Sequence, residues 1–179
     1  MSLMPISQAR KLLGEPAKQT SWELLIPNPP PSAAPFILGV TLRVRSTVIP
    51  GFGITPYVTT SGPYEFRHPG KKTFPSPFPL RFEEGHKFPV RPVFNMWAEN
   101  AQSELAGTAL EEHWLGSDVW LRLLSERPED TVQIVHSYHF INAWPEKVEN
   151  APVSYDSEGL VFFDVQMAYD FWRWEPWPF

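Results

Sequence analysis

Prolines interrupt this chain so often that long helices are difficult to place in it. The sequence holds 21 prolines in 179 residues, more than twice the usual share of about 5%. Proline breaks helix interiors, and the 26 aromatic side chains (8 Trp, 5 Tyr and 13 Phe) favour strands. We therefore expect a mostly β, α+β fold built from short strands and stiff loops.

Alternation of apolar and polar residues predicts the strands, and one stretch has the period of a helix. The clearest strand covers 160–172, where an unbroken apolar face starts at Val161. The helix covers 90–101. We also expect strands at 21–26, 40–45, 71–84, 118–124 and 131–142, a Pro/Gly-rich loop over 50–70, and short helical turns at 7–13 and 109–114. These elements predict an antiparallel β-sandwich or open barrel of about six strands with one packed helix.

The expected domain organisation has three parts. An N-terminal arm and first strand occupy 1–35, a β-sandwich domain occupies 36–172, and an aromatic extension occupies 173–179. The extension holds Trp174, Trp177 and Phe179 and is either a cover for the core edge or an anchor in a neighbouring subunit. The chain shows no signal peptide, and no apolar run approaches the ~20 residues of a membrane span.

The residues that usually carry catalysis are absent or badly placed. The chain has no cysteine, which excludes disulfides, thiolate metal sites and cysteine nucleophiles. His136 and His139 fall on opposite faces of one expected strand, and no nucleotide-binding or catalytic motif occurs. We expect no enzymatic activity, no catalytic residue, no metal site and no cofactor.

Charge is distributed unevenly along the sequence. Residues 36–92 carry 8 basic and 3 acidic side chains (+5), whereas residues 99–170 carry 3 basic and 14 acidic ones (−11). The split is typical either of two solvated faces of one domain or of copies that associate head to tail, basic half against acidic half.

Three stretches, taken in order, resemble the tail tube proteins of contractile-tailed phages and related injection machines. The first is 41–51, a strand followed by a Pro/Gly loop, and the second is 72–84 followed by Phe94-Asn95-Met96-Trp97. The third comprises Asn142-Ala143-Trp144-Pro145, then 153–157, and a long strand that closes in Tyr169-Asp170-Phe171-Trp172. The resemblance covers roughly residues 36–172.

The resemblance implies a structural virion protein that forms hexameric rings. These rings would stack into the hollow inner tail tube through which DNA passes, with tail sheath and baseplate proteins as further partners. Assembly would take place in the host cytoplasm. The high proline content and residues 173–179 depart from the family pattern, which leaves a baseplate tube-initiator as an alternative. An alternative of another class is a carbohydrate-binding module with Trp114, Trp120, Trp174 and Trp177 as sugar platforms.

The resemblance, together with the alternation of polar and apolar residues, predicts which side chains face the lumen and which join stacked rings. Polar residues opposite the apolar strand faces are expected to face the lumen: Thr41, Arg43, Arg45, Thr131, Gln133, Ser137, His139, Asp164, Gln166 and Asp170. Charged and aromatic residues in loops and at strand ends are expected to join stacked rings: Arg67, Lys71, Lys72, Lys87, Glu111, Glu112, Glu126, Glu129, Asp130, Trp174, Trp177 and Phe179.

Overall fold

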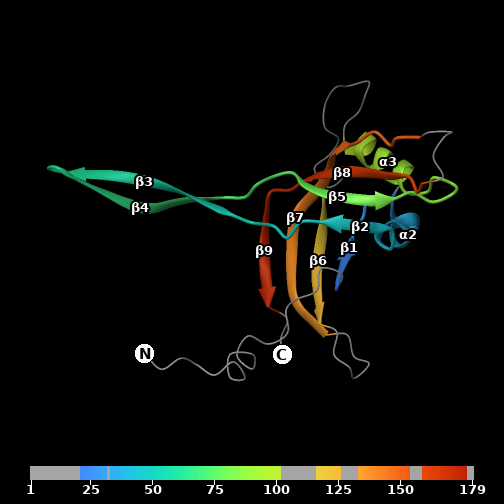
Figure 1. Ribbon diagram of the computed structural model, residues 1–179, viewed down its shortest axis with the longest axis horizontal. Coiled ribbons are helices and arrows are strands. Elements are labelled where there is room, and N and C mark those ends of the chain that lie inside the picture. The colour runs from blue at the N-terminus through green and yellow to red at the C-terminus, as the bar shows by residue number, and fades with distance from the viewer. Residues whose placement is uncertain (1–20, 32, 102–115, 126–132, 154–158, 177–179) are drawn as a thin grey trace.

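The computed structural model describes residues 21–31, 33–101, 116–125, 133–153 and 159–176 (Figure 1). Nine strands form in these residues: β1 (Trp22–Leu25), β2 (Val44–Thr47), β3 (Gly53–Ser61), β4 (Tyr64–Thr73), β5 (Phe78–Glu83), β6 (Ser117–Ser125), β7 (Gln133–Val148), β8 (Phe162–Ala168) and β9 (Phe171–Pro176). The helices are η1 (Ala34–Phe36), α2 (Ile37–Thr41) and α3 (Arg91–Ala101). The expectation of a mostly β antiparallel fold is confirmed, and none of the helices in the described residues is long and apolar enough to cross a membrane.

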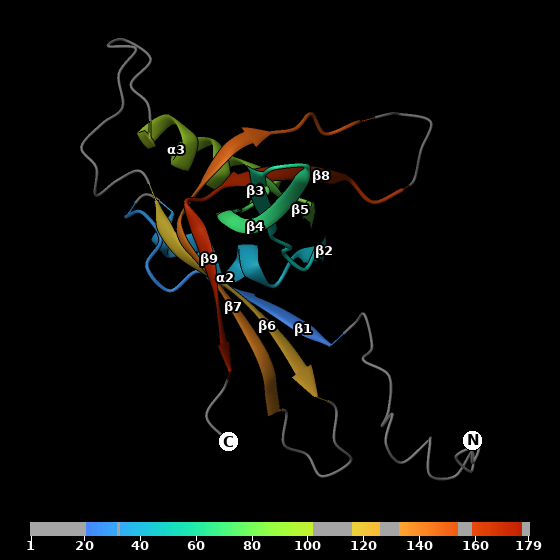
Figure 2. The same cartoon turned by 90° about the vertical axis from the view of Figure 1, so that its left-hand side faces the viewer.

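Seven strands form one antiparallel sheet that folds over on itself at β7. Its order is β1-β6-β7-β8-β5-β2, with β9 also paired to β7. We call β1, β6, the first half of β7 and β9 sheet A, and the second half of β7, β8, β5 and β2 sheet B. Figures 1 and 2 show the strands of sheet A running across those of sheet B. The remaining strands, β3 and β4, pair only with each other within the described residues.

A local corner explains why the sheet folds at β7. Asn142 has a positive φ of 54°, and its side-chain amide donates to the carboxylate of Asp170 at 3.0 Å. A Cβ on Gly116 would lie 1.9 Å from the Asn142 side-chain oxygen, so only glycine fits beside this turn. The single strand expected over 160–172 is therefore wrong: it divides at Asp170 into β8 and β9, which belong to different sheets.

The core lies between the apolar faces of the two sheets and is closed by α3. Phe140 of sheet A stacks on Phe78 of sheet B with ring centroids 4.2 Å apart. On α3, Phe94 and Trp97 are fully buried, and Phe94 contacts Phe82 of β5. The helix expected at 90–101 is confirmed.

Three further expectations about local structure were wrong. The strand expected over 71–84 is not continuous, because β4 ends at Thr73 and β5 begins at Phe78 in another sheet. Residues 40–45 were expected to form a strand, but residues 37–41 form α2, whose inner face buries Val40. Residues 50–70 were expected to be a loop, but they contribute most of the β3–β4 hairpin, which projects far from the body of the protein (Figure 1).

Glu84 caps the helix that closes the core. Its carboxylate accepts the backbone N–H groups of Val90 at 2.8 Å and Arg91 at 3.0 Å, and its side chain is buried. These donors have no partner within the helix, and the helix dipole favours a negative charge there.

We expect Glu84→Ala to lower the free energy of unfolding by about 1–2 kcal/mol, because the two donors lose their acceptor. Urea denaturation measures this loss. Glu83→Ala is the matched control, since Glu83 makes a surface ion pair with Arg45 at 2.5 Å that contributes about 0–1 kcal/mol. Equal losses in the two variants would contradict the capping role.

Candidate assembly surfaces

Within the described residues, sheet A has an open edge at each end. β9 lies at one end and β1 at the other, and each pairs with one neighbour within the described residues. Adjacent strands are antiparallel throughout, so β1 and β9 run in opposite directions. A second copy placed with its β1 beside β9 would therefore continue the same antiparallel order. Open edges of this kind are templates for pairing with another chain.

The outer face of sheet A is polar and carries linked charges. Glu23 of β1 pairs with Arg122 of β6 at 3.3 Å. On β7, the His139 ring nitrogens lie 3.3 Å from a carboxylate oxygen of Asp118 and 3.5 Å from one of Glu175. These contacts tie β6, β7 and β9 together on one face. With Arg173 included, this face holds three acidic and two arginine side chains.

The expected lumen residues do not gather on one surface. Ser137 and His139 lie on the outer face of sheet A, and Gln133 begins the same strand. Asp164 and Gln166 lie on sheet B, opposite the buried Val165. Because the apolar faces of the two sheets meet in the core, their outer faces point away from it on different sides.

The remaining expected lumen residues have other surroundings. Arg45 of β2 is paired with Glu83, and Asp170 accepts a hydrogen bond from Asn142 at the sheet corner. Thr41 ends α2 and donates to the Leu38 carbonyl oxygen at 3.1 Å, so its expected strand position was wrong. Arg43 lies between α2 and β2, where its guanidinium packs against Gly85, and Thr131 is outside the described residues.

The β3–β4 hairpin has two different faces. Tyr57, Tyr64 and Phe66 share one face, where each is at least half exposed, and the Tyr57 ring stacks on His68 at 5.1 Å. Arg67 lies on the other face. A two-stranded ribbon is marginally stable alone, and this one leaves an aromatic face in solvent. The aromatic face of the hairpin is therefore a candidate surface for contact with another protein.

The root of the hairpin is held by aromatic rings around one ammonium group. The Lys72 Nζ lies 4.3 Å from the Phe52 ring centroid and 5.3 Å from that of Trp172, at cation–π distances. The Trp172 indole N–H donates to the Gly51 carbonyl oxygen at 3.0 Å. These contacts tie both ends of the hairpin to the open-edge strand β9.

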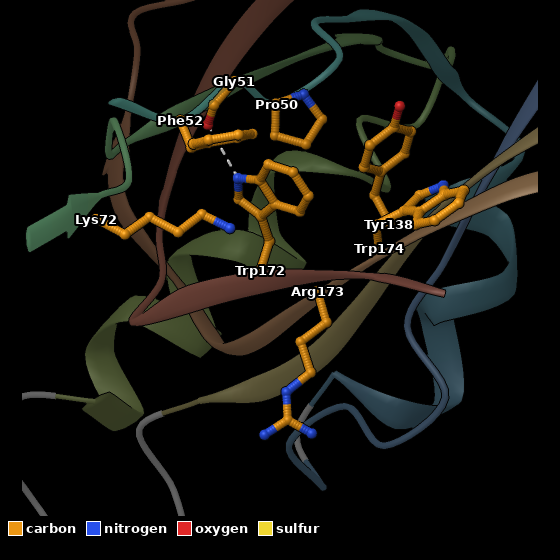
Figure 3. A pocket seen from close by; sticks show the side chains of 8 residues that line it. All are labelled: Pro50, Gly51, Phe52, Lys72, Tyr138, Trp172, Arg173 and Trp174. Atoms are coloured by element: carbon orange, nitrogen blue, oxygen red, sulfur yellow. Dashed lines mark hydrogen bonds between the residues drawn. The ribbon is translucent and has the colours of Figure 1, made fainter. Parts of the chain in front are cut away.

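A pocket of about 920 Å³ opens beside this root (Figure 3). We call it the root pocket. Figure 3 shows Phe52 and Lys72 on one side of it and Tyr138 and Trp174 on another. Its lining residues are Pro50, Gly51, Phe52, Lys72, Tyr138, Trp172, Arg173 and Trp174. Trp174 is 52% exposed, so a large aromatic side chain of the edge strand faces solvent here.

A second exposed apolar surface lies at the opposite flank of the molecule, on α2. Leu38 and Leu42 are four residues apart and therefore share the outer side of this helical turn. They are 71% and 73% exposed, whereas Val40 points into the core. Figure 1 shows α2 on the side of sheet A that carries β1, away from the hairpin.

The expected stacking residues are only partly described. Arg67 and Lys71 lie on the hairpin, whereas Lys87 lies in the connection between β5 and α3 at the opposite end of the protein (Figure 1). Lys72 belongs to the aromatic root. Outside the described residues are Glu111, Glu112, Glu126, Glu129, Asp130, Trp177 and Phe179.

The expected sugar-platform tryptophans do not form a common surface in the described residues. Trp120 stacks on His139 with centroids 4.0 Å apart, and Trp174 donates to His136 at 3.2 Å. Trp114 and Trp177 are outside the described residues. Among the described residues, no three His, Asp or Glu side chains group as metal ligands.

Sequence reasoning missed the aromatic face of the β3–β4 hairpin and the exposed leucines of α2. The hairpin has a detectable signal: Tyr57, Thr59 and Ser61 alternate before Gly62, and Tyr64, Phe66 and His68 alternate after it. For α2, the i, i+4 spacing of Leu38 and Leu42 was the available signal.

Comparison with known proteins relates these surfaces to a family. Residues 39–175 match the family model described as phage tail tube protein. Curated protein sequences gave no significant match. Among solved structures, a chain of the sheath/tube terminator of an extracellular contractile injection system, PVC, has a TM-score of 0.65 at 12% identity, covering 91% of this chain and 99% of that one.

Two other solved chains are also similar. A chain of the anti-feeding prophage baseplate has a TM-score of 0.62 at 11% identity and covers 91% of this chain and 97% of that one. A chain of the PVC sheath–tube complex has a TM-score of 0.59 at 12% identity, with coverages of 97% and 99%. At these identities the similarity shows a common fold.

Proposed function

Because this chain belongs to the phage tail tube protein family, we propose that it is a structural subunit which closes into rings of six. The rings stack into the hollow inner tube of a contractile tail, and the subunit performs no catalysis. The observation that carries the proposal is the pair of edge strands of sheet A within the described residues, β9 and β1, which run in opposite directions and can therefore pair as antiparallel neighbours.

The proposed ring closes by pairing β9 of each subunit with β1 of the next. We call this junction the seam. Six copies of the four strands of sheet A make a barrel of 24 strands (6 × 4), in which no edge of sheet A remains open. The contact is heterologous, which is the kind that closes a ring.

Both faces of sheet A are compatible with such a seam. On the polar side β9 offers Arg173 and Glu175 and β1 offers Glu23, so a register that places Glu23 beside Arg173 brings opposite charges together. On the apolar side β9 offers Trp174 and β1 offers Leu24. Trp174, which the sequence placed at the ring-to-ring contact, lies in β9 and in this proposal serves the seam.

The polar face of sheet A lines the bore in the proposed ring. Ser137 and His139 then face the lumen, together with the Glu23–Arg122 pair. Positive charge on this face is offset by neighbouring carboxylates, so DNA phosphates find few unpaired cations. A wall of this kind suits DNA passage, because every phosphate contact formed would have to be broken again.

The hairpin gives the ring its contacts beyond the seam. With ten residues in β4 it reaches about 30 Å, enough to cross onto a neighbouring copy. Its charged face, which includes Arg67, is available to acidic groups of the next ring. The outer surface of the stacked rings would contact the tail sheath, and an end ring would contact the baseplate, within a particle assembled in the host cytoplasm.

Charge reversal on the hairpin tests the stacking contact. We expect Arg67→Glu with Lys71→Glu to block growth of rings into tubes while each subunit stays folded, because like charges then meet at every junction. Lys72 is left intact, since its ammonium holds the hairpin root. Turbidity and negative-stain microscopy measure tube growth. Growth unaffected by the reversal, and by salt well above 0.15 M where screening acts within about 8 Å, would contradict electrostatic stacking.

Sedimentation velocity and negative-stain microscopy of the purified chain test the proposal as a whole. Tubes indicate a subunit of the tube body. Rings that do not stack indicate the alternative of an initiator at the baseplate. A monomer at every concentration, with or without baseplate, would contradict a tube subunit and favour the carbohydrate-binding alternative.

A further inference from the structure

Within the described residues, two exposed apolar surfaces lie on opposite flanks of sheet A. The root pocket is lined by Trp172, Arg173 and Trp174 of β9 and by residues at the root of the hairpin (Figure 3). The outer side of α2, with Leu38 and Leu42, lies on the β1 flank. A sideways shift that brings β1 of one copy beside β9 of another also brings α2 towards the root pocket.

We infer that the root pocket receives Leu38 and Leu42 of the neighbouring copy. This inference rests on the proposed ring and names the residues that lock its seam. The occupant is a second copy of this chain, because the leucines of α2 and the root pocket occur on the same molecule. Pairing of β1 of one copy with β9 of another brings these two surfaces together. The contact is heterologous, as the seam is.

The chemistry of the two surfaces is complementary. The rings of Phe52, Tyr138 and Trp174 line the pocket together with the Lys72 side chain. The two leucines are the most exposed large apolar side chains of the α2 region. Burial of exposed apolar surface in a formed aromatic pocket is the usual source of interface stability.

Two side chains of the pocket are held in place before a neighbour arrives. The Trp172 indole is fixed by its hydrogen bond to Gly51, and the Lys72 ammonium lies over the neighbouring rings. A preformed socket loses little conformational entropy on binding. Ring closure would also fix the hairpin, since the same side chains hold its root.

Chemical cross-linking tests the contact, and the chain has no native cysteine to interfere. The variants are Phe52→Cys in the pocket and Leu42→Cys on α2, treated with a short bifunctional maleimide. We expect cross-linked dimers when the two single variants are mixed, and a ladder that ends at six subunits when both substitutions are in one chain. Val135→Cys, on the outer face of sheet A, replaces Leu42→Cys as the control and gives no ladder.

A second variant measures the contribution of the leucines. Leu42→Lys should raise the concentration needed for half-maximal ring formation by about tenfold or more, because a second ammonium group would enter a pocket that already holds that of Lys72. The thermal midpoint of the subunit should not change, since Leu42 is 73% exposed. Rings that form without the specific cross-link, or that tolerate Leu42→Lys, would overturn this inference and leave the proposed function standing. Absence of any ring from the native chain would overturn both.

Discussion

Replacing Trp174 with glutamate is expected to abolish ring formation while the subunit remains folded. Trp174 lies on the apolar side of the edge strand β9 and is 52% exposed, so the isolated subunit depends little on it. In the proposed ring it is covered at every seam. Loss of a buried interface tryptophan costs about 2–4 kcal/mol, and a buried unpaired carboxylate adds to this cost.

Sedimentation velocity measures whether the Trp174→Glu variant forms rings, and circular dichroism measures whether its subunit stays folded. The control is Val135→Glu, which places a carboxylate on the opposite, polar face of the same sheet. We expect rings from the control and monomers of native stability from Trp174→Glu. Rings of normal abundance from Trp174→Glu would show that the β9 edge is not part of the interface.

Removal of the hairpin is expected to prevent tube formation without unfolding the subunit. Replacement of residues 56–69 by an Asn-Gly turn keeps Thr55 and Gly70 as its flanks, because Pro56 pairs with Pro69. Nearly every residue of the hairpin is exposed, and no residue of β3 or β4 belongs to the core. The free energy of unfolding should therefore change by less than about 1 kcal/mol.

Microscopy and urea denaturation of the shortened chain provide the measurement. Tubes of normal length would contradict a role for the hairpin in assembly. A loss of stability above about 2 kcal/mol would show instead that the hairpin supports the fold of its own subunit.

Strand register was predictable from the sequence where one face of a strand enters the core. In β8, Val165 and Met167 are buried while Asp164 and Gln166 lie on the other face, as the period-two pattern indicated. The helix α3 was predictable for the same reason, because its apolar residues recur with a helical period. The break at Asp170 was not, since the side-chain alternation continues through the corner.

The hairpin was missed because its composition is that of a loop. Pro56 and Pro69 face each other at an irregular step of the ribbon, and a two-stranded ribbon has free edges where proline is tolerated. Its strands bury no core residue, so no hydrophobic face marked them as strands. α2 was missed because a short apolar run fits a strand or a helical turn equally well, and burial of Val40 decides between them.

The seam itself was not predictable from the sequence, because an edge strand is recognised only when its neighbours are known. The sequence indicated that strands would need partners, but β1 was grouped with an N-terminal arm at 1–35. In the structure β1 is paired with β6 and forms one end of sheet A.

Reconstruction of the assembled ring by electron cryomicroscopy would show the seam itself. We expect sixfold rings whose inner wall is one continuous antiparallel barrel, with β9 of each subunit hydrogen-bonded to β1 of the next. Rings in which β1 and β9 both remain unpaired, or in which the subunits are joined through other surfaces, would contradict this expectation.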